Sequence, residues 1–421
     1  MCDTLVYSDK NATYLMKNCD REPGEFQPVV RLPAVYGDHT ETVATTYLEI
    51  PQVANRFGVL LCKPAWGWGG EMGVNDRGVS IGYEAVFTDL IDKKGKSLLG
   101  LDLVRLGLER GRDARQALEQ IIQLLERYGQ GGPSGFRNKH MRHDNSFLIA
   151  DPQEAWLLES AGNLWVSKRV EKFAAISNRL SIGTHYENCS KGIVGEDGRK
   201  PSFADAHNTW FTPFFCGALS RQERSHQALA SLAGAKPAFS DLASILRGHY
   251  RQSNSMAWHD NRDLCMHAAS YARPVQTCGS MMVRLAHTGQ HDFFFTGTSA
   301  PCLSLFKPVA FGDTDFGVLT DAGTPVAQSL WFQHESIHRR CLFDKDLARE
   351  LRADRDQVES CIFALIEGAS QREVAYADAN RLAAAWQENW YRRASAKPLP
   401  AWGLGQYRHF WRKQNHMDGI V

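Results

Sequence analysis

Short apolar runs separated by turn residues dominate the first 85 positions of the chain. Runs of this kind, rich in β-branched and aromatic residues, are typical of strands. Glycines between them, above all at 67, 69 and 70, indicate turns. The pattern predicts strands at residues 3–7, 12–17, 42–50, 56–62 and 78–83.

Helical spacing of apolar residues begins after this region. A Leu-rich segment at 97–110 predicts one helix, and Asp113 stands where the N-cap of a second helix belongs. One buried stripe of the second helix is predicted from apolar residues at helical spacing, namely Ala114, Ala117, Leu118, Ile121, Ile122 and Leu125. Packing alone explains both helices.

The rest of the chain returns first to strands and then to helices. Closely spaced apolar runs at 146–150, 155–159, 164–168 and 173–177, with turn residues between them, predict an antiparallel meander. Beyond it the pattern predicts helices at 220–232 and 239–250, strands at 280–285 and 291–296, and mostly helix from about 324 to 396.

This order of elements predicts an α+β fold in which helices cover two antiparallel sheets. No internal repeat and no low-complexity linker interrupts the chain. The simplest division is therefore a core at 2–310 and a mainly helical C-terminal extension at 311–421 that packs on the core.

Charge and hydropathy argue against two classes of partner. Lys and Arg number 48 and Asp and Glu 47, so the formal net charge of +1 gives no field that would attract nucleic acid or an anionic membrane. No stretch approaches the roughly 18 apolar residues of a membrane-spanning helix. The first residues lack the basic and apolar segments of a secretory signal, and we expect a cytoplasmic protein. The sequence leaves the oligomeric state open and is compatible with a homo-oligomer.

Metal and cofactor motifs are weak. The ten cysteines are scattered without any Cys-x-x-Cys pair. His140-x-x-His143, Cys265-x-His267 and His259-Asp260 contain metal-ligand residue types, but none has zinc-protease or zinc-finger spacing. The Gly-rich stretches at 67–73 and 129–135 match neither phosphate-loop nor dinucleotide patterns. We therefore expect no metal and no other cofactor.

Cys2 carries the strongest candidate chemistry. Aminopeptidases remove an initiator Met readily when the next side chain is small, and removal here would give one residue both a thiol and a free α-amine. With a pKa of about 7.7–8.0, the amine is partly neutral near pH 7 and can take the proton of a thiol whose pKa is about 8.5. Nucleophile and general base are then joined by covalent geometry. The alternative is that Cys2 is merely the second residue of a buried strand.

Motifs in a fixed order support the catalytic interpretation. They are Cys2-Asp3-Thr4, Lys17-Asn18-Cys19-Asp20-Arg21, Trp66-Gly67-Trp68-Gly69-Gly70-Glu71-Met72-Gly73-Val74-Asn75, Glu84-Ala85-Val86, Phe147-Leu148-Ile149-Ala150-Asp151, Ile176-Ser177-Asn178-Arg179, Cys265-Met266-His267 and Phe295-Thr296-Gly297-Thr298. These motifs resemble those of the secernins, which belong with the dipeptidases of peptidase family C69. The resemblance covers most of residues 2–310, and Cys19 stands where the family has Ser.

The resemblance implies a four-layer αββα sandwich of the N-terminal nucleophile hydrolases, with Cys2 as nucleophile. By position, Asp20 resembles the acid that orients the α-amine, and Asn178 resembles the side-chain donor of the oxyanion hole. Asn75 marks a backbone N–H that would be the second donor. Arg221 resembles a cation near the nucleophile, which would favour the thiolate.

Each of these four residues also has a structural interpretation. Asp20 can be a turn residue or a helix cap, Asn178 can end a strand, and Asn75 can form a hairpin turn. Arg221 can lie on a solvated helix face, and Arg224 competes for its role by a shift of register.

Three residues of the Gly-rich segment are candidates for substrate binding. Trp66 and Trp68 are expected to border the substrate site, although aromatics beside a Gly-rich loop can equally pack in the core. Glu71 could receive a substrate α-amine through a charge-assisted hydrogen bond.

The sequence thus predicts a cysteine-type hydrolase of small peptides, similar to a dipeptidase, whose partner is the small peptide or amide substrate. One alternative is the same chemistry, as hydrolysis or acyl transfer, on a non-peptide amide. Another is a non-catalytic interaction protein similar to some secernins.

Overall fold

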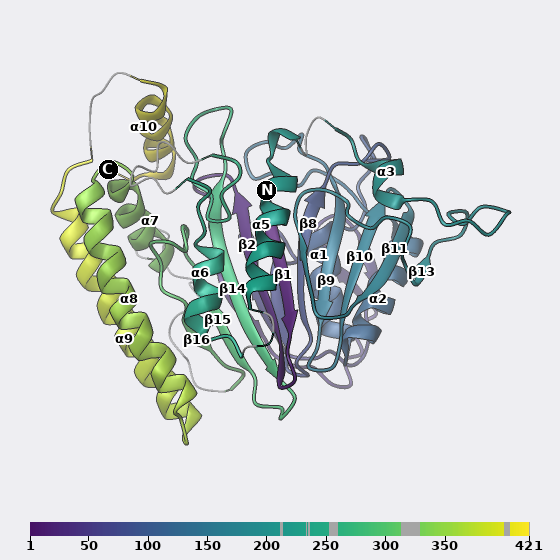
Figure 1. Cartoon of the computed structure of the whole chain (residues 1–421), viewed down its shortest axis with the longest axis horizontal. Coiled ribbons are helices and arrows are strands. Elements are labelled where there is room, and N and C mark those ends of the chain that lie inside the picture. Colours follow the sequence, from purple (N-terminus) through teal and green to yellow (C-terminus); the bar gives the residue numbers. More distant parts are fainter. Residues whose placement is uncertain are drawn as a thin grey trace. The chain divides into compact units, whose positions relative to one another are not determined.

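The chain is described by a computed structural model that covers residues 1–210, 214–232, 234, 236–251, 260–312, 329–399 and 405–420 (Figure 1). It divides into two compact units. Unit 1 comprises residues 1–17, 30–236 and 283–291, and unit 2 comprises 18–29, 237–282 and 292–421.

An eight-stranded sheet forms the centre of unit 1. From β13 to β6 each pair of neighbouring strands runs antiparallel. The strand order is β13 (Asn188–Cys189), β11 (Leu164–Val170), β10 (Ala155–Ala161), β9 (Asp144–Ala150), β8 (Ser80–Val86), β7 (Met72–Asn75), β6 (Val59–Cys62) and β3 (Val29–Leu32).

Helices α1 (Gly100–Arg110) and α2 (Ala114–Tyr128) pack against this sheet. Their buried leucines and isoleucines join Ile81, Phe147 and Ile149 of the sheet in one apolar core. The predicted cap is confirmed, because Oδ1 of Asp113 accepts a hydrogen bond from the backbone nitrogen of Gln116 at 2.7 Å. The amphipathic pattern therefore forms the outer helical layer of unit 1.

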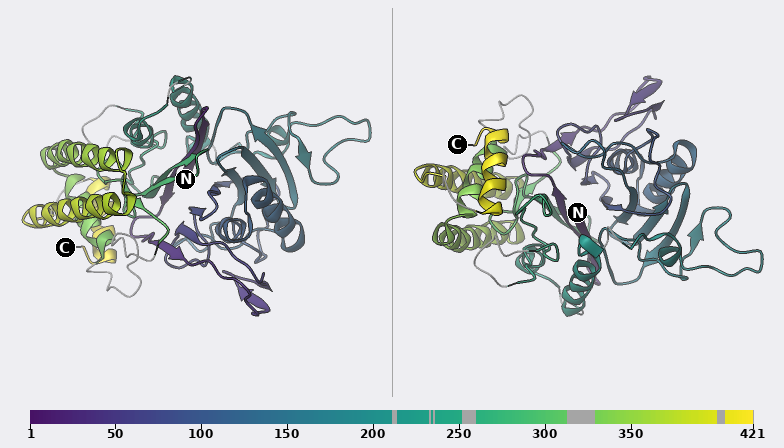
Figure 2. Two further views of the ribbon diagram at one scale, coloured as in Figure 1. Left: turned by 90° about the horizontal axis from the view of Figure 1, so that it is seen from below. Right: turned by 90° about the horizontal axis from the view of Figure 1, so that it is seen from above.

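A second sheet faces the first within unit 1. There β1 (Cys2–Ser8) lies between β12 (Phe173–Ile176) and β2 (Ala12–Arg21) in the strand order, and β1 also contacts β8 and β9. Helix α5 (Ala218–Ser231) packs on β12 and β1. Figure 2 shows α5 and the α1–α2 pair on opposite sides of these sheets. The layer order of unit 1 is thus αββα, as expected for an α+β fold of this type.

Some strands differ from the sequence-based prediction. The run at 173–177 forms β12, which leaves the meander and pairs with β1, with Thr4 opposite Ile176. The run at 42–50 contains two short strands, β4 (Thr42–Ala44) and β5 (Glu49–Pro51), which form a hairpin. The prediction missed β3 and β7, which have four residues each.

Unit 2 contains the last residues of β2, followed in the strand order by β14 (Gln276–Ala286), β15 (Asp292–Phe295) and β16 (Lys307–Val309). Its helices are α6 (Phe239–Leu246), α7 (Leu330–Cys341), α8 (Lys345–Glu367), α9 (Arg372–Ser395) and α10 (Gln406–Asp418). Rings of Phe239, Phe294 and Phe363 join α6, β15 and α8, with centroids 4.6–5.6 Å apart.

The C-terminal region is helical in the described residues, while positions 324–328 of the predicted segment lie outside them. The structure groups the chain differently from the expected division at 310, because 18–29, 237–282 and 292–310 belong with the C-terminal helices. In the described ranges, no helix combines the length and the apolar character needed to cross a membrane.

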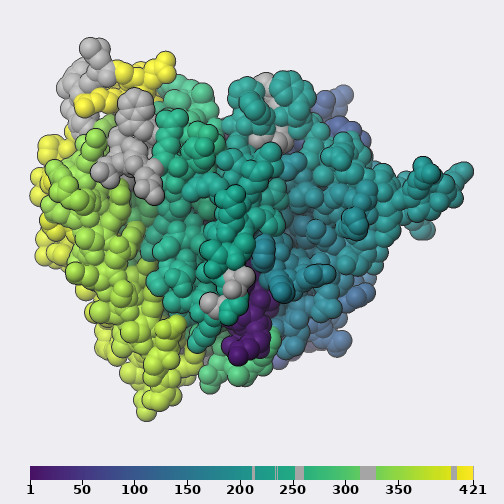
Figure 3. Space-filling view, viewed as in Figure 1, coloured from purple at the N-terminus to yellow at the C-terminus, as the bar shows by residue number. Residues whose placement is uncertain are grey.

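One long connection stands out on the surface of unit 1. Residues 190–202, between β13 and α3 (Phe203–His207), extend away from the sheet (Figure 3). Almost all of residues 191–200 are exposed.

Candidate active site

Cys2 begins β1, and the alternation of that strand determines what surrounds it. The side chain of Asp3 contacts Arg221 of α5, whereas Thr4 donates a hydrogen bond to Oε1 of Glu84 on β8 at 2.5 Å. Side chains two residues apart in a strand share a face. The side chain of Cys2 therefore shares the face of Thr4, between the two sheets of unit 1.

The backbone nitrogen of Cys2 is bound by Asn178, just beyond β12. It donates to Oδ1 of Asn178 at 2.9 Å, and Nη2 of Arg221 donates to the same oxygen at 2.6 Å. The amide nitrogen of Asn178 donates to the carbonyl of Ala85 at 2.8 Å, which fixes the orientation of the side chain. Asn178 and Arg221 are thus brought together at the nitrogen that becomes the α-amine if Met1 is removed.

Arg221 is fully buried and connects several parts of this site. Its Nε lies 2.9 Å from Oδ2 of Asp3, its Nη2 lies 2.9 Å from Oγ of Ser177, and its Nη1 lies 3.6 Å from Sδ of Met1. Burial raises the pKa of Asp3 to about 6, although Arg221 opposes the shift. The alternative residue Arg224 is half-buried on the same helix. The guanidinium therefore provides a fixed positive charge beside the first residues of the chain.

A second buried cation lies on the other side of β1. Nζ of Lys17 is 3.1 Å from Oε1 of Glu84 and 2.6 Å from the carbonyl oxygen of Tyr83. Burial raises the pKa of Glu84 well above its usual range, against the effect of Lys17. The two sheets approach closely here, because a Cβ at Gly82 would lie 2.8 Å from Cγ2 of Thr4 and 2.9 Å from Cδ of Lys17. Glycine at 82 leaves the room that this arrangement needs.

Glu71 is a substrate-binding candidate that the structure places near the sulfur of Cys2. One of its carboxylate oxygens is within 4.8 Å of Sγ of Cys2, and its side chain is buried. Cys2 itself is 5% exposed with Met1 in place. Pockets of about 880 and 590 Å³ in unit 1 are lined by other residues and do not include Cys2. The sulfur is therefore buried, with a carboxylate oxygen of Glu71 nearby.

Trp66 and Trp68 are partly buried, and both pack on the apolar core between α1, α2 and the eight-stranded sheet. The guanidinium carbon of Arg105, on α1, lies 3.9 Å from the ring centroid of Trp68. A Cβ at Gly69 would lie only 2.0 Å from the carbonyl oxygen of Leu101, so the Gly-rich segment follows the start of α1 closely. These contacts agree with the alternative in which the two tryptophans pack in the core and do not border a substrate site.

Asn75 has the contacts of its hairpin-turn alternative. Its backbone nitrogen, expected to face the oxyanion, donates instead to the carbonyl of Val79 at 2.8 Å. Its amide donates to Leu108 and Gly111, and its Oδ1 accepts from the backbone nitrogen of Val79 at 2.9 Å. This N–H is therefore already used inside the turn.

Asp20 belongs to unit 2, at the end of β2. Its Oδ1 accepts a hydrogen bond from Oγ1 of Thr277 at 2.6 Å, and the side chain is buried. Its role at the α-amine of Cys2 stays a prediction.

Asp3, Lys17, Glu84 and Ser177 are site residues that the sequence did not single out by role. The available signal was the presence of charged residues inside otherwise apolar strands, because buried charges are rare unless they are paired. That signal indicates that partners exist without saying which residues they are.

Solved structures similar to this chain include two hydrolases with low sequence identity. A variant of conjugated bile acid hydrolase from Clostridium perfringens is 11% identical, covers 75% of this chain and 94% of its own, and has a TM-score of 0.46. Penicillin V acylase from Agrobacterium tumefaciens is 12% identical, covers 75% and 87%, and has a TM-score of 0.40. Similarity at this level does not identify an activity.

One segment of the sequence matches a family model. Residues 91–208, which contain α1, α2, the meander and Asn178, match the model of peptidase family C69. Cys2 and Arg221 lie outside the matched segment. The match shows that this part of the chain is similar to the peptidases of family C69, and the class of enzyme that it indicates is an amide hydrolase.

Proposed function

We propose that the chain is a cysteine-type N-terminal nucleophile hydrolase that cleaves small peptides, most simply dipeptides, through Cys2 after removal of Met1. The observation that carries the proposal is the bond between the nitrogen of Cys2 and Oδ1 of Asn178, at 2.9 Å. It would hold the α-amine in one orientation beside its own thiol. Dipeptides follow from the resemblance to the family's dipeptidases and from Glu71 near the sulfur.

The charges around the amine favour its role as a base. The backbone nitrogen of Cys2 and Nη2 of Arg221 both donate to Oδ1 of Asn178, at 2.9 and 2.6 Å. The guanidinium therefore lies close to the nitrogen that would become the α-amine. A neighbouring cation disfavours the charged form of an amine and favours a thiolate. An amine that donates one N–H to Asn178 keeps its lone pair for the thiol proton.

The reaction then proceeds in two steps. The α-amine takes the proton of the Cys2 thiol, and the thiolate attacks the carbonyl carbon of the substrate amide. The resulting ammonium returns the proton to the leaving amine as the C–N bond breaks, which leaves a thioester on Cys2. Water attacks the thioester with the amine as base, the acid leaves, and the thiol is regenerated.

The oxyanion of each tetrahedral intermediate needs hydrogen-bond donors. The amide of Asn178 has two N–H groups, of which one donates to Ala85. The second is the side-chain donor that we assign to the oxyanion, where one donor contributes roughly 3–4 kcal/mol to transition-state stabilisation. With the backbone N–H of Asn75 bound to Val79, the second donor is not assigned to a residue.

Glu71 would distinguish peptides with a free N-terminus from other amides. A carboxylate within 4.8 Å of the nucleophilic sulfur is positioned to receive the substrate α-ammonium. In Glu71→Gln we expect KM to rise for dipeptides and to stay unchanged for N-acetyl dipeptides. If the KM of the variant equals that of wild type for the dipeptide as well as for its N-acetyl analogue, this assignment is wrong.

The central experiment controls the first residue of the chain. The protein is produced behind a leader that a site-specific protease removes directly before Cys2, and intact mass verifies the new N-terminus. We expect dipeptide hydrolysis only after the leader is removed. Cys2→Ala should abolish it, whereas Cys189→Ala, a half-buried cysteine of the same unit, should retain it.

Other outcomes would decide against the peptide substrate or against catalysis. Cleavage of N-acyl amines without cleavage of dipeptides would identify a non-peptide amide hydrolase. Product formation that depends on an added amine would identify acyl transfer. A mature chain that keeps Met1, or whose Cys2 is converted to a carbonyl, would exclude the proposed mechanism.

A further inference from the structure

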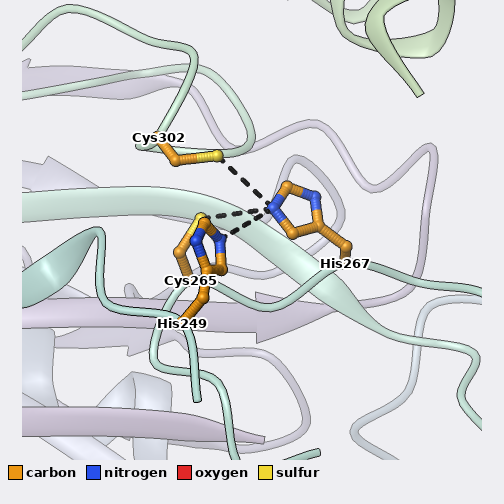
Figure 4. Close-up of side chains that lie close together, drawn as sticks. All are labelled: His249, Cys265, His267 and Cys302. Atoms are coloured by element: carbon orange, nitrogen blue, oxygen red, sulfur yellow. Dashed lines mark hydrogen bonds between the residues drawn. The ribbon is translucent and has the colours of Figure 1, made fainter. Parts of the chain in front are cut away.

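Four potential metal ligands meet in unit 2, far along the sequence from Cys2. They are His249 after α6, Cys265 and His267 in the loop before β14, and Cys302 in the turn between β15 and β16. One ligand atom of each lies within 4.8 Å of those of the other three. Figure 4 shows the two sulfurs and the ring of His249 converging on Nε2 of His267. We propose that these four residues bind one transition-metal ion, for which Zn²⁺ is the best fit.

The distances match the edges of a tetrahedron around zinc. Zinc–sulfur bonds of about 2.3 Å and zinc–nitrogen bonds of about 2.0–2.1 Å give separations of about 3.3 Å between nitrogens and about 3.6 Å between nitrogen and sulfur. Nε2 of His267 lies 3.2 Å from Nε2 of His249, 3.4 Å from Sγ of Cys302 and 3.7 Å from Sγ of Cys265. Three of the six edges therefore have lengths that suit a zinc tetrahedron, and the other three are at most 4.8 Å.

The donor set also selects the ion. Two thiolates and two imidazoles in tetrahedral arrangement are typical of Zn²⁺, whereas Mg²⁺ and Ca²⁺ require oxygen ligands. Four protein ligands fill the coordination sphere of zinc, which is the pattern of structural sites rather than catalytic ones. The inferred role is to hold unit 2 together.

The side chains are in an environment that suits ligands. Cys265, His267 and Cys302 are buried, and His249 is half-buried. Binding of Zn²⁺ would replace the thiol protons, which would pass to solvent as two Zn–S bonds form.

Backbone bonds hold the ligand segments against each other without the ion. The nitrogens of Leu264 and Cys265 both donate to the carbonyl of Gly248, beside His249, at 3.0 and 3.1 Å. Oγ1 of Thr277 accepts from the nitrogen of Met266 at 2.8 Å, and the carbonyl of Thr277 accepts from the nitrogen of Ala300 at 2.9 Å. The site is thus largely formed by the fold.

The turn that presents Cys302 is unusual in its backbone. Ala300 has φ of 52° and is the single non-glycine residue with positive φ in the described part of the chain. Left-handed backbone at a non-glycine residue costs free energy and concentrates at functional sites. This second observation sets the turn apart from an ordinary core contact.

Linear spacing did not reveal the site because its ligands come from three separate segments. Cys265-x-His267 alone has no zinc-finger spacing, and His249 and Cys302 are brought to it only by the fold. The sequence therefore favoured ordinary surface or core histidines and no metal.

The site has a direct link to Asp20 within unit 2. Thr277, which accepts from Met266 between the two ligands of the loop, donates to Oδ1 of Asp20 at 2.6 Å. Loss of the ion would loosen the loop that orients Thr277, and through it the position of Asp20.

The test measures metal directly in the untagged full-length protein. Elemental mass spectrometry gives the zinc content, and titration of chelator-treated, reduced protein with Zn²⁺ against a chromophoric chelator gives affinity and stoichiometry. Titration with Co²⁺ reports tetrahedral geometry and thiolate ligation by its visible and charge-transfer absorption. We expect one ion per chain in wild type and in Cys341→Ser, a buried cysteine of unit 2 outside the cluster.

The variants provide the decisive comparison. Cys265→Ser combined with Cys302→Ser should lower affinity by at least about 100-fold, since loss of outer-shell contacts alone costs about 10–100-fold. Chelation should lower the Tm of wild type and leave that of the double variant unchanged. If the double variant fails to fold, His249→Ala should still bind more weakly, and His249→Cys should restore binding with stronger charge-transfer absorption.

Three results would overturn the proposal. The first is wild-type protein without stoichiometric binding of Zn²⁺ or Co²⁺. The second is binding that survives unchanged in the double variant. The third is a Cys265–Cys302 disulfide in the isolated protein, with stability independent of metal, which would identify a redox pair instead.

Discussion

Asn178 and Cys2 meet through a single hydrogen bond of 2.9 Å, from the backbone nitrogen of Cys2 to Oδ1 of Asn178. The register of two strands brings them together. Thr4 of β1 lies opposite Ile176 of antiparallel β12, and two further residues along each strand lead to Cys2 and Asn178. The orientation of the proposed general base therefore depends on strand pairing rather than on a flexible loop.

Substitution of Asn178 separates its two functions. Asn178→Asp keeps an oxygen for Cys2 and Arg221 but removes the amide N–H, so we expect kcat to fall about 10²–10³-fold if that N–H serves the oxyanion. Asn178→Ala also removes the acceptor oxygen, so kcat should fall further in this variant. Steady-state kinetics on a dipeptide measures both, with Asn188→Ala on the exposed strand β13 as control. A wild-type kcat in Asn178→Asp would leave Asn178 only the amine-orienting function.

Removal of Arg221 should cost stability as well as activity. In Arg221→Met the carboxylate of Asp3 stays buried without its cation, and such a loss typically costs about 3–5 kcal/mol. The free energy of unfolding from urea titration measures the effect. Arg224→Met, a half-buried position on the same helix, should change it by no more than about 0.5 kcal/mol. Similar values for both variants would show that the Asp3–Arg221 pair contributes little.

The raised pKa of Asp3 predicts a specific pH dependence of stability. Its folded pKa of about 6 exceeds the value of about 3.9 in an unfolded chain. Between these values the unfolded chain loses the proton while the folded chain keeps it, so the contribution of Asp3 to stability falls as pH rises. Two pKa units correspond to about 3 kcal/mol.

Asp3→Asn isolates this contribution. The free energy of unfolding of wild type minus that of Asp3→Asn should decrease from about pH 4 to about pH 6 and then stay level. Urea titrations across this range measure it. A difference that is nearly level above pH 4 and falls as pH drops below about 4 would mean that the attraction of Arg221 outweighs burial and lowers the pKa of Asp3.

Local signals predicted the elements whose boundaries are determined by neighbouring residues. The cap at Asp113 and the stripe of α2 depend on contacts within a few positions, and both are present. Which sheet a strand joins depends on distant residues, and the sequence therefore placed 173–177 in the meander although β12 pairs with β1. The division into units escaped prediction for the same reason, since β2 and β14 each contribute to both.

The candidate site shows the same limit. The resemblance singled out Asn178 and Arg221. In the structure, Arg221 and the backbone nitrogen of Cys2 both donate to Oδ1 of Asn178. The resemblance did not single out the buried pair of Lys17 and Glu84, because spacing along the chain says nothing about partners across two sheets. For Asn75 the local interpretation as a turn was the more informative one, since all its described hydrogen bonds lie in or next to the hairpin or cap α1.

Gly82→Ala tests whether the close approach of the two sheets positions the site. The new methyl group would lie 2.8 Å from Cγ2 of Thr4 and 2.9 Å from Cδ of Lys17. Thr4 has a stiff β-branched side chain, and Lys17 is held by its bonds to Glu84 and Tyr83, so neither can move freely. Overpacking of this kind typically costs about 1–3 kcal/mol, and displacement of β1 should lower kcat as well.

Two further variants make that prediction specific. Gly183→Ala is the matched control, because its Cβ would lie 3.9 Å from Oγ of Ser202, an ordinary contact distance. Thr4→Ser removes the crowded methyl group and keeps the hydroxyl that donates to Glu84. Combined with Gly82→Ala, it should recover part of the lost stability and kcat. A double-mutant cycle measures the coupling, and additive effects would mean that the two strands do not press on each other at this position.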